Sequence, residues 1–340
     1  MLKVLSLSCR PAAQRVRVPY LSWRPSSSLP RSQSPLSRFR IFPQPKLELR
    51  LYNSTPARMS SVDTSLHPHT SGRAAEFAKA HSAPNELILY GGWFCPFVQR
   101  SWITLHEKNI PHQYIEINPY EKDPEFLKLN PRGLVPTLAV PVTKNKNKIQ
   151  KPLYESVVIC EYLDEVYNDP AKNGPSLLPA DDAYERARCR IWIDHISGRI
   201  VPAFYRFMQH SDSKPYTLDE ARAEFLHHIK TFVAEADPEG PFFLGDQFGM
   251  VDIMLAPWLC RLFLFDVYKG GLGIPEEGKG GQDEHIWQRW RKWAKAVEAR
   301  QSVQDTLSER KQYIDAYRRY AEDTTQSQVA QATRAGRRLP

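Results

Sequence analysis

Residues 86–100 read ELILYGGWFCPFVQR, and this stretch decides the fold around it. Its first five residues form an apolar run rich in strand-forming side chains, which Gly91 and Gly92 end. From Cys95 onward, apolar residues recur at close to helical spacing as far as Lys108. The stretch therefore predicts a strand, a tight loop and a helix that begins at Cys95.

The segments after this helix alternate between the same two kinds of pattern. Short apolar runs predict strands and amphipathic runs predict helices, at residues 113–117 (strand), 124–129 (helix), 137–140 and 152–154 (strands) and 156–167 (helix). Lysines and asparagines at 144–151 predict a solvated turn between the last two strands. The resulting order, β-α-β-α-β-β-α, indicates a small mixed sheet packed against helices.

A polar stretch with several prolines and glycines, ending near residue 182, predicts a linker. Strand patterns end there, and helix-length patterns follow at residues 183–209, 218–236, 250–265, 284–300 and 309–320. We therefore expect an α/β domain at 81–170 and an all-helical domain at 183–322. Residues 323–340 are polar and lack periodicity, so they are expected to form a disordered tail.

The positive charge of the chain is concentrated at its N-terminal end. The formal net charge is +8, yet residues 1–62 hold eleven Lys and Arg and only one acidic residue. The remaining residues sum to −2, which argues against nucleic acid as the partner of the folded domains. An Arg-, Ser- and Pro-rich leader is typical of a mitochondrial transit peptide, and a disordered basic tail is the alternative. Residues 1–80 are expected to lie outside the fold, and a second start at Met59 would give a cytosolic form.

Two further classes of protein are excluded by simple counts. The sequence has five widely spaced cysteines, which argues against a disulfide scaffold and against a structural zinc site. It has no run of 18 or more apolar residues, so no membrane-spanning helix is expected. We expect a globular protein of two domains that needs no metal.

The chemistry of the chain centres on Cys95. Unpaired N–H groups and the positive end of a helix stabilise a thiolate there, and such a position lowers a thiol pKa from about 8.5 to ~3.5–7.5. Val98 stands where the second cysteine of a C-x-x-C pair would be, so this is a single-thiol site. The alternative is that Cys95 is only a small buried apolar residue.

Two other motifs point to the same pocket. Pro136 precedes an apolar strand, and a cis peptide bond there would expose the backbone of Val135 to a peptide-like ligand; an ordinary strand-entry proline is the alternative. Ser156, near a helix start, offers a hydroxyl and N–H groups to a carboxylate, and Glu155 can pair with an ammonium group. Together they suit the free end of an amino acid, although a simple helix cap would have the same residues.

Residues 85–320 resemble the glutathione transferase family, and the Cys-Pro-Phe motif is most similar to the omega class. The resemblance rests on five motifs taken as a set: ILYGGWFCPFVQR, NPRGLVPTL, YESVVICEYLDE, FFLGDQFGMVDIMLAPW and QYIDAYRRYAE. It implies a thioredoxin-like N-terminal domain followed by a helical C-terminal domain. It also implies glutathione as cosubstrate and a homodimer as the usual assembly.

The resemblance also assigns roles to single residues. Cys95 would form a mixed disulfide with glutathione. The residues that would bind glutathione are Phe97, Lys122, Val135, Pro136, Glu155 and Ser156. Lys122 would meet the glycyl carboxylate, Val135 the cysteinyl part, and Glu155 with Ser156 the γ-glutamyl end. Trp258 and Arg222 would line the pocket for the acceptor substrate.

These assignments favour a glutathione-dependent thiol transferase or reductase. Cys95 would react with a small-molecule or protein-thiol acceptor, and free glutathione would release the product. Dehydroascorbate reduction and deglutathionylation are the activities that the resemblance implies. Conjugation of glutathione to electrophiles, as in detoxification, is the second hypothesis, and a non-catalytic interaction module is the third.

Overall fold

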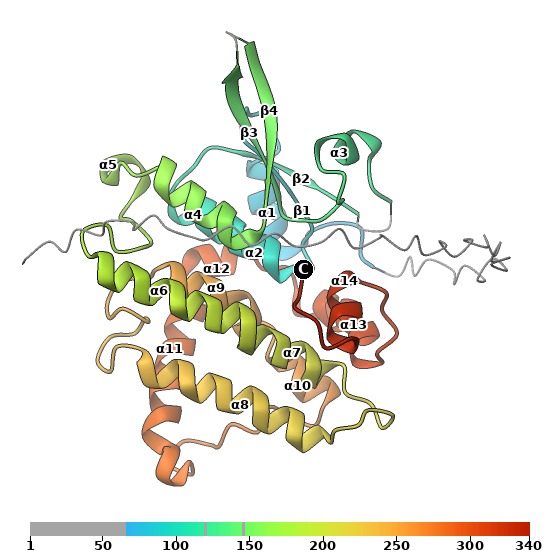
Figure 1. Cartoon of the computed structure of the whole chain (residues 1–340), viewed down its shortest axis with the longest axis vertical. Coiled ribbons are helices and arrows are strands. Elements are labelled where there is room, and N and C mark those ends of the chain that lie inside the picture. Colours follow the sequence, from blue (N-terminus) through green and yellow to red (C-terminus); the bar gives the residue numbers. More distant parts are fainter. Residues whose placement is uncertain (1–65, 119–120, 145–146) are drawn as a thin grey trace, which may run out of the picture. The chain divides into compact units, whose positions relative to one another are not determined.

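The computed structural model describes residues 66–118, 121–144 and 147–340, which belong to one compact unit (Figure 1). The leader predicted at residues 1–62, with the second start at Met59, falls outside this part of the chain. The described part contains two regions, a sheet with helices first and helices alone afterwards. This is the α/β and all-α organisation that the sequence predicts.

The first region is a small mixed sheet with helices packed on it. Its strands are β1 (Ile88–Gly91), β2 (Gln113–Glu116), β3 (Thr137–Lys144) and β4 (Asn147–Tyr154). Its helices are α2 (Pro96–Glu107), α3 (Pro124–Leu129) and α4 (Ser156–Val166). In the sheet order β2-β1-β3-β4, β1 is parallel to β2 and antiparallel to β3, and β3 is antiparallel to β4. The predicted order of elements is confirmed.

The predicted turn over residues 144–151 is wrong for most of its length. β3 and β4 pair from Thr137 opposite Tyr154 as far as Lys144 opposite Asn147. β1 pairs with only the first three residues of β3, so the rest of the hairpin extends past the sheet (Figure 1). The residues of this extension are largely exposed, so polar side chains can occupy strand positions there. Their composition therefore resembles that of a loop.

The second region is helical throughout its described elements. They are α5 (Pro170–Asn173), α6 (Ala183–His195), α7 (Val201–Met208), α8 (Leu218–Glu235), α9 (Met250–Leu259), α10 (Phe263–Tyr268), α11 (Glu284–Ala299), α12 (Gln301–Asp305) and α13 (Arg310–Ala321). A π-helical turn, η1 (Ile196–Ile200), joins α6 to α7, and a 3-10 turn, η2 (Gly281–Asp283), leads into α11. Within the described residues, no helix combines the length and apolar character needed to cross a membrane.

A buried ion pair holds the linker between the two regions. Lys108, which follows α2, places its Nζ atom 3.0 Å from Oδ1 of Asp164 on α4, and both side chains are buried. The same carboxylate accepts hydrogen bonds from the backbone N–H groups of Leu177 and Leu178, at 2.9 and 3.0 Å. Because the buried charge is paired and hydrogen-bonded, its desolvation is offset. The linker is thereby fixed against α4.

The prediction that residues 1–80 lie outside the fold is wrong for the segment just before β1. Residues Gly72–Ala80 form a helix, α1, in which Ala74 is fully buried. Its Arg73 pairs with Asp305 of α12 at 2.7 Å, and Ser71 at its start receives a hydrogen bond from the backbone of Glu309 at 3.0 Å. The stretch is short and rich in alanine, so its stability comes from these tertiary contacts rather than from a strong local pattern.

The predicted disordered tail at 323–340 is also wrong in part. Residues Gln328–Arg334 form a helix, α14, in which Ala330 and Ala332 are buried. Arg334 pairs with Asp323 at 2.9 Å and fixes the turn that precedes the helix. Small alanine side chains allow close packing, but they give a weak apolar periodicity in the sequence.

Candidate functional site

Cys95 lies at the start of α2, as the sequence predicts. It is the N-cap residue, and Pro96 follows it at the beginning of the helix. The backbone N–H of Cys95 donates to the carbonyl of Gly92 at 3.0 Å, so the loop after β1 closes tightly. Taken as a whole residue, Cys95 is partly exposed.

The surroundings of the Cys95 sulfur act on its ionisation in opposite directions. Burial is the largest effect and raises the pKa of the thiol above its ordinary value. The N–H groups of Phe97 and Val98 and the charges of Arg261 and Arg100 lower the pKa, but they offset burial only in part. The expectation of a pKa below the ordinary range of thiols is therefore wrong. The start of the helix acts in the expected direction, and desolvation outweighs it.

The loop before β3 places the backbone carbonyl of Val135 next to Cys95. The Val135–Pro136 peptide bond is cis. The Cys95 Sγ–H donates to the carbonyl of Val135 over 3.9 Å. The buried side chain of Asn130 holds the loop in shape by donating to Oγ1 of Thr137 at 2.8 Å. Two of the predicted glutathione-binding residues thus lie beside Cys95.

Lys122 lies against the same loop. Gly133, two residues before Val135, has a φ of +61°. The Lys122 side chain passes so close that a Cβ atom at Gly133 would lie 3.0 Å from its Nζ atom. The backbone angle and this close approach both favour glycine at the position. The ammonium group therefore lies against the loop before β3, and its contact with a glycyl carboxylate stays a prediction.

Glu155 and Ser156 meet at the start of α4. Glu155 has a φ of +72°, and its carboxylate pairs with the half-exposed guanidinium of Arg132 at 2.8 Å. Ser156 is buried, and its Oγ accepts a hydrogen bond from Arg100 at 3.3 Å. The Glu155 side chain does not cap α4, so the first N–H groups of this helix can meet an anionic ligand.

The two aromatic residues assigned to the site are in contact. The ring of Phe97 meets that of Trp258 edge to face, with centroids 5.0 Å apart. Trp258 is fully buried, so it supports Phe97 from behind. Arg222 is not brought to this place: its guanidinium donates to the carbonyls of Lys269 and Gly271, at 3.0 and 3.3 Å. These contacts hold Arg222 against the loop after α10, and its assignment to the acceptor pocket stays a prediction.

Comparison with known proteins decides the family. Family models described as "Glutathione S-transferase, N-terminal domain" and "Glutathione S-transferase, C-terminal domain" match residues 94–166 and 215–296. The omega-1 glutathione S-transferase of Sus scrofa is 36% identical over 184 residues, which cover 53% of this chain and 68% of that protein. The chain belongs to the glutathione S-transferase family. The omega-1 enzyme of Rattus norvegicus is 35% identical over 200 residues, which cover 56% of this chain and 76% of its own.

Solved structures of the glutathione S-transferase family agree with this assignment. The Omega 3C transferase from Trametes versicolor is 39% identical with a TM-score of 0.64, and the match covers 76% of this chain and 100% of that one. A rice transferase solved in complex with glutathione is 26% identical with a TM-score of 0.53, covering 68% and 94%. The thioredoxin-like and helical regions and the omega class are thereby confirmed. Membership of the family supports a glutathione-dependent transferase function.

Two arginines of this transferase lie beside Cys95 and were missed by reasoning from the sequence. Arg100 is buried on α2 and bonds Ser156. Arg261 is fully buried after α9; its Nη1 donates to Gln99 at 2.6 Å, while its Nε and Nη2 have no hydrogen-bond partner among the described residues. The available signal was an arginine within an otherwise apolar run, WLCRLFLF for Arg261.

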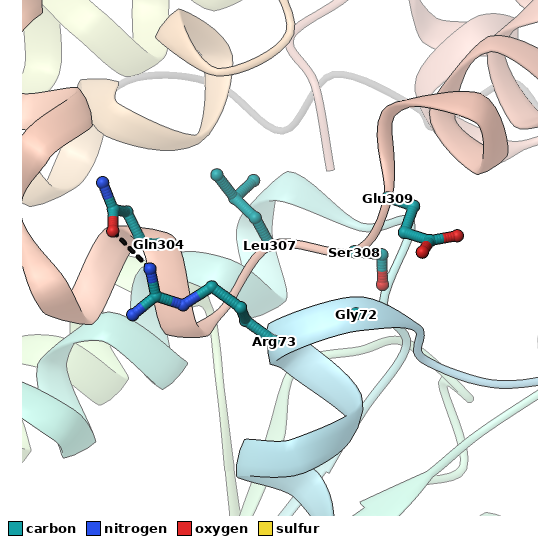
Figure 2. A pocket seen from close by; sticks show the side chains of 6 residues that line it. All are labelled: Gly72, Arg73, Gln304, Leu307, Ser308 and Glu309. Carbon is teal, nitrogen blue, oxygen red and sulfur yellow. Dashed lines mark hydrogen bonds between the residues drawn. The ribbon is translucent and has the colours of Figure 1, made fainter.

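A shallow, open pocket of about 400 Å³ lies elsewhere, between the start of α1 and the segment before α13 (Figure 2). Arg73 points across it and donates to Gln304, and Ser308 and Glu309 line its other end (Figure 2). None of the predicted glutathione-binding residues lines this pocket. In residues 66–118, 121–144 and 147–340, no group of three or more His, Cys, Asp or Glu side chains is arranged to hold a metal ion.

Proposed function

We propose that this transferase is a thiol transferase or reductase that acts through a mixed disulfide between Cys95 and glutathione. One observation carries the proposal: a cysteine sulfur, rather than a hydroxyl, occupies the start of α2 beside the backbone of Val135. A hydroxyl can activate bound glutathione without forming a bond to it, whereas a cysteine at this place forms a disulfide readily.

The reaction takes two exchange steps. The Cys95 thiolate attacks the glutathione sulfur of a glutathionylated substrate, a new S–S bond forms, and the substrate leaves as a thiolate that takes up a proton. The thiolate of a second glutathione then attacks the glutathione sulfur held on Cys95. This step releases glutathione disulfide and restores the Cys95 thiolate. Overall, the mixed disulfide of the substrate is reduced to a thiol, and glutathione is oxidised to glutathione disulfide.

The residues around Cys95 suit these steps. Arg261, Arg100 and the start of α2 favour the thiolate as attacking and leaving group, against the effect of burial. The glutathione peptide would lie along Val135, with its γ-glutamyl end at Ser156 and Glu155. Its other end would approach Lys122, which lies against Gly133. The acceptor would be a small molecule or a protein thiol.

Substitution of Cys95 by serine tests the proposal. We expect Cys95→Ser to abolish the reduction of a glutathionylated peptide while glutathione binding, measured by calorimetry, is largely kept. Mass spectrometry after exposure to glutathione disulfide should show one adduct of glutathione, located on Cys95. Cys160 is fully buried and serves as the matched control, so Cys160→Ser should leave the adduct in place.

Two results would count against the proposal and favour the other hypotheses. If Cys95→Ser reduced the peptide as fast as the parent protein, the mixed disulfide would not be on the reaction path. If the variant instead conjugated glutathione to 1-chloro-2,4-dinitrobenzene as fast as the parent, and the parent reduced no disulfide, conjugation would be the activity. Absence of glutathione binding in the parent would indicate a non-catalytic module.

We further propose that the protein forms a homodimer through the exposed face of α4 and α6. Val158 on α4 and Ile191 on α6 are apolar, yet their side chains are 52% and 65% exposed. An ion pair between Glu161 and Arg190, at 2.9 Å, joins the two helices into one surface. Unpartnered apolar side chains of this size favour contact with another protein surface.

The molar mass of the protein, measured by light scattering as it elutes from a size-exclusion column, tests whether it is a dimer. We expect Val158→Glu combined with Ile191→Glu to convert a dimer into a monomer, because a charge on each helix would be buried unpaired in the interface. Val267 on α10 is exposed to a similar degree and provides the control, since Val267→Glu should leave the mass unchanged. A parent protein that elutes with the mass of one chain would refute the proposal.

We also propose that residues 1–62 direct the chain to mitochondria. The support is compositional: eleven basic residues, one acidic residue and many serines. A fluorescent reporter fused after residue 62 should enter mitochondria, and the same fusion starting at Met59 should stay in the cytosol. A diffuse signal from the full leader would refute the proposal.

A further inference from the structure

Arg100 is a buried cation whose hydrogen-bond partners among the described residues are all neutral. Its side chain is 1% exposed, and the described part of the chain gives it three hydrogen-bond acceptors, all of them neutral. These are the carbonyl of Met254 at 2.9 Å, Oγ of Ser156 at 3.3 Å and Oγ of Ser197 at 3.3 Å. Removal of a guanidinium from water without an anion nearby is costly, so its retention calls for a reason beyond packing.

The aromatic residues of the site fix this guanidinium in place. Its central carbon lies 4.5 Å from the ring centroid of Trp258 and 5.5 Å from that of Phe97. Ring faces attract a cation, and these two rings leave the guanidinium little freedom to turn. Burial lowers the pKa of Arg100 to about 10, so the group keeps its charge at neutral pH.

The hydrogen bond from Arg100 orients the hydroxyl group of Ser156. Because the Ser156 oxygen accepts from Arg100, its own hydroxyl hydrogen is free to point elsewhere and to donate. Ser156 is also the first residue of α4, where unpaired backbone N–H groups point outward. A carboxylate placed at this point would meet the hydroxyl, the start of the helix and, behind them, the positive charge of Arg100.

We infer that Arg100 is a positioning residue for glutathione, which orients Ser156 and supplies the positive charge that selects the α-carboxylate of the γ-glutamyl end. This inference rests on the proposed glutathione site. It adds Arg100 as the residue that makes the site selective for an anionic group. Arg100 acts through Ser156 and does not itself contact the peptide. Its bonds to Met254 on α9 and Ser197 on η1 tie this recognition to the helical region.

The test compares two peptides that differ by one carboxylate. Calorimetry should show that Arg100→Met weakens the binding of glutathione by about 10-fold, because the Ser156 hydroxyl loses the partner that orients it and the site loses a positive charge. The analogue γ-aminobutyryl-cysteinylglycine, which lacks the α-carboxylate, should bind the parent and the variant equally. Arg289→Met is the matched control, because Arg289 also donates to backbone carbonyls but lies on α11.

Two further variants separate a loss of glutathione recognition from a loss of folding. Arg100→Lys keeps a charge and should weaken glutathione binding by less than Arg100→Met. In a Ser156→Ala background, Arg100→Lys should have almost no further effect on affinity, because the two residues act in series. Circular dichroism would establish that each variant is folded.

Three outcomes would count against these proposals, and each can be told from the others. If Arg100 variants weaken both peptides equally, or weaken neither, the positioning role is overturned while the glutathione site stands. If the parent protein binds glutathione no better than the analogue that lacks the carboxylate, the inference fails at its first step. Absence of glutathione binding in the parent would overturn the proposed function itself.

Discussion

Lowering the pH from 7 to 5 should destabilise the protein through His112. Its ring is buried and stacks on that of His81, with centroids 4.2 Å apart. Its Nδ1 bonds the carbonyl of Ile110 at 2.8 Å, whereas its Nε2 has no hydrogen-bond partner among the described residues. Burial lowers the pKa of His112 from 6.5 to about 4, and the nearby rings of His81 and His106 act in the same direction.

The size of the effect follows from the two pKa values. Below pH 6.5 the unfolded chain binds a proton at this position and the folded chain does not, so protonation favours unfolding. The stability is complete above pH 6.5 and is lost as the pH falls toward 4. A shift of this size corresponds to about 3 kcal/mol in total, of which about 2 kcal/mol is lost between pH 7 and pH 5.

Urea unfolding at several pH values measures this loss. The parent should lose about 2 kcal/mol more than His112→Phe between pH 7 and pH 5, because phenylalanine fills the site but does not titrate. His285 is exposed on α11, so His285→Phe should follow the parent. Equal pH dependence in the parent and in His112→Phe would refute the reasoning, whatever their absolute stabilities.

Three further predictions concern charges. Arg261→Met should raise the pKa of Cys95 and slow its alkylation by iodoacetamide at pH 8, since a charge that favours the thiolate is removed. Asp164→Ala should lower the free energy of unfolding by about 3–5 kcal/mol, measured in urea, because Lys108 is left buried and unpaired. Glu155→Gln should weaken the binding of glutathione in calorimetry but not that of glutaryl-cysteinylglycine, which lacks the α-amino group.

The first two of these predictions have matched control variants in the chain. Arg291→Met removes an arginine on α11 and should leave the alkylation of Cys95 unchanged. Lys172→Ala breaks an exposed ion pair with Asp169 and should cost less than about 1 kcal/mol. An unchanged alkylation rate in Arg261→Met, a loss under about 1 kcal/mol in Asp164→Ala, or equal weakening of both peptides by Glu155→Gln would contradict the respective prediction.

Elements with a strong local pattern could be predicted from the sequence. The strand before Cys95 and the helix after it have clear apolar periodicity, and Cys95 lies where that pattern puts it. The outer part of the β3–β4 hairpin, α1 and α14 could not be predicted in this way. The outer part of the hairpin is largely exposed and polar, and the two helices depend on contacts with distant segments, so their local sequence carries little signal.

Residues of the site could be predicted from the sequence only where they belong to a short, contiguous motif. Val135, Glu155 and Ser156 belong to short motifs, and the structure brings them to the start of α2 or α4. Burial is a tertiary property, so the sequence could not show that desolvation raises the pKa of Cys95. For the same reason, buried Arg261 and partly exposed Arg222 look alike in a sequence.

The packing of α1 bears on how a recombinant protein should be designed. The backbone N–H of Ala74 donates to the carbonyl of Leu307, and Ser71 is hydrogen-bonded to Ser308 and Glu309, so this short helix is tied to the segment between α12 and α13. A truncation at residue 81, where the sequence predicts that the first domain begins, would remove α1 and its hydrogen bonds. The surface of the helical region that α1 covers would then be exposed to solvent. A truncation at residue 66 would remove the basic leader and keep every one of these hydrogen bonds.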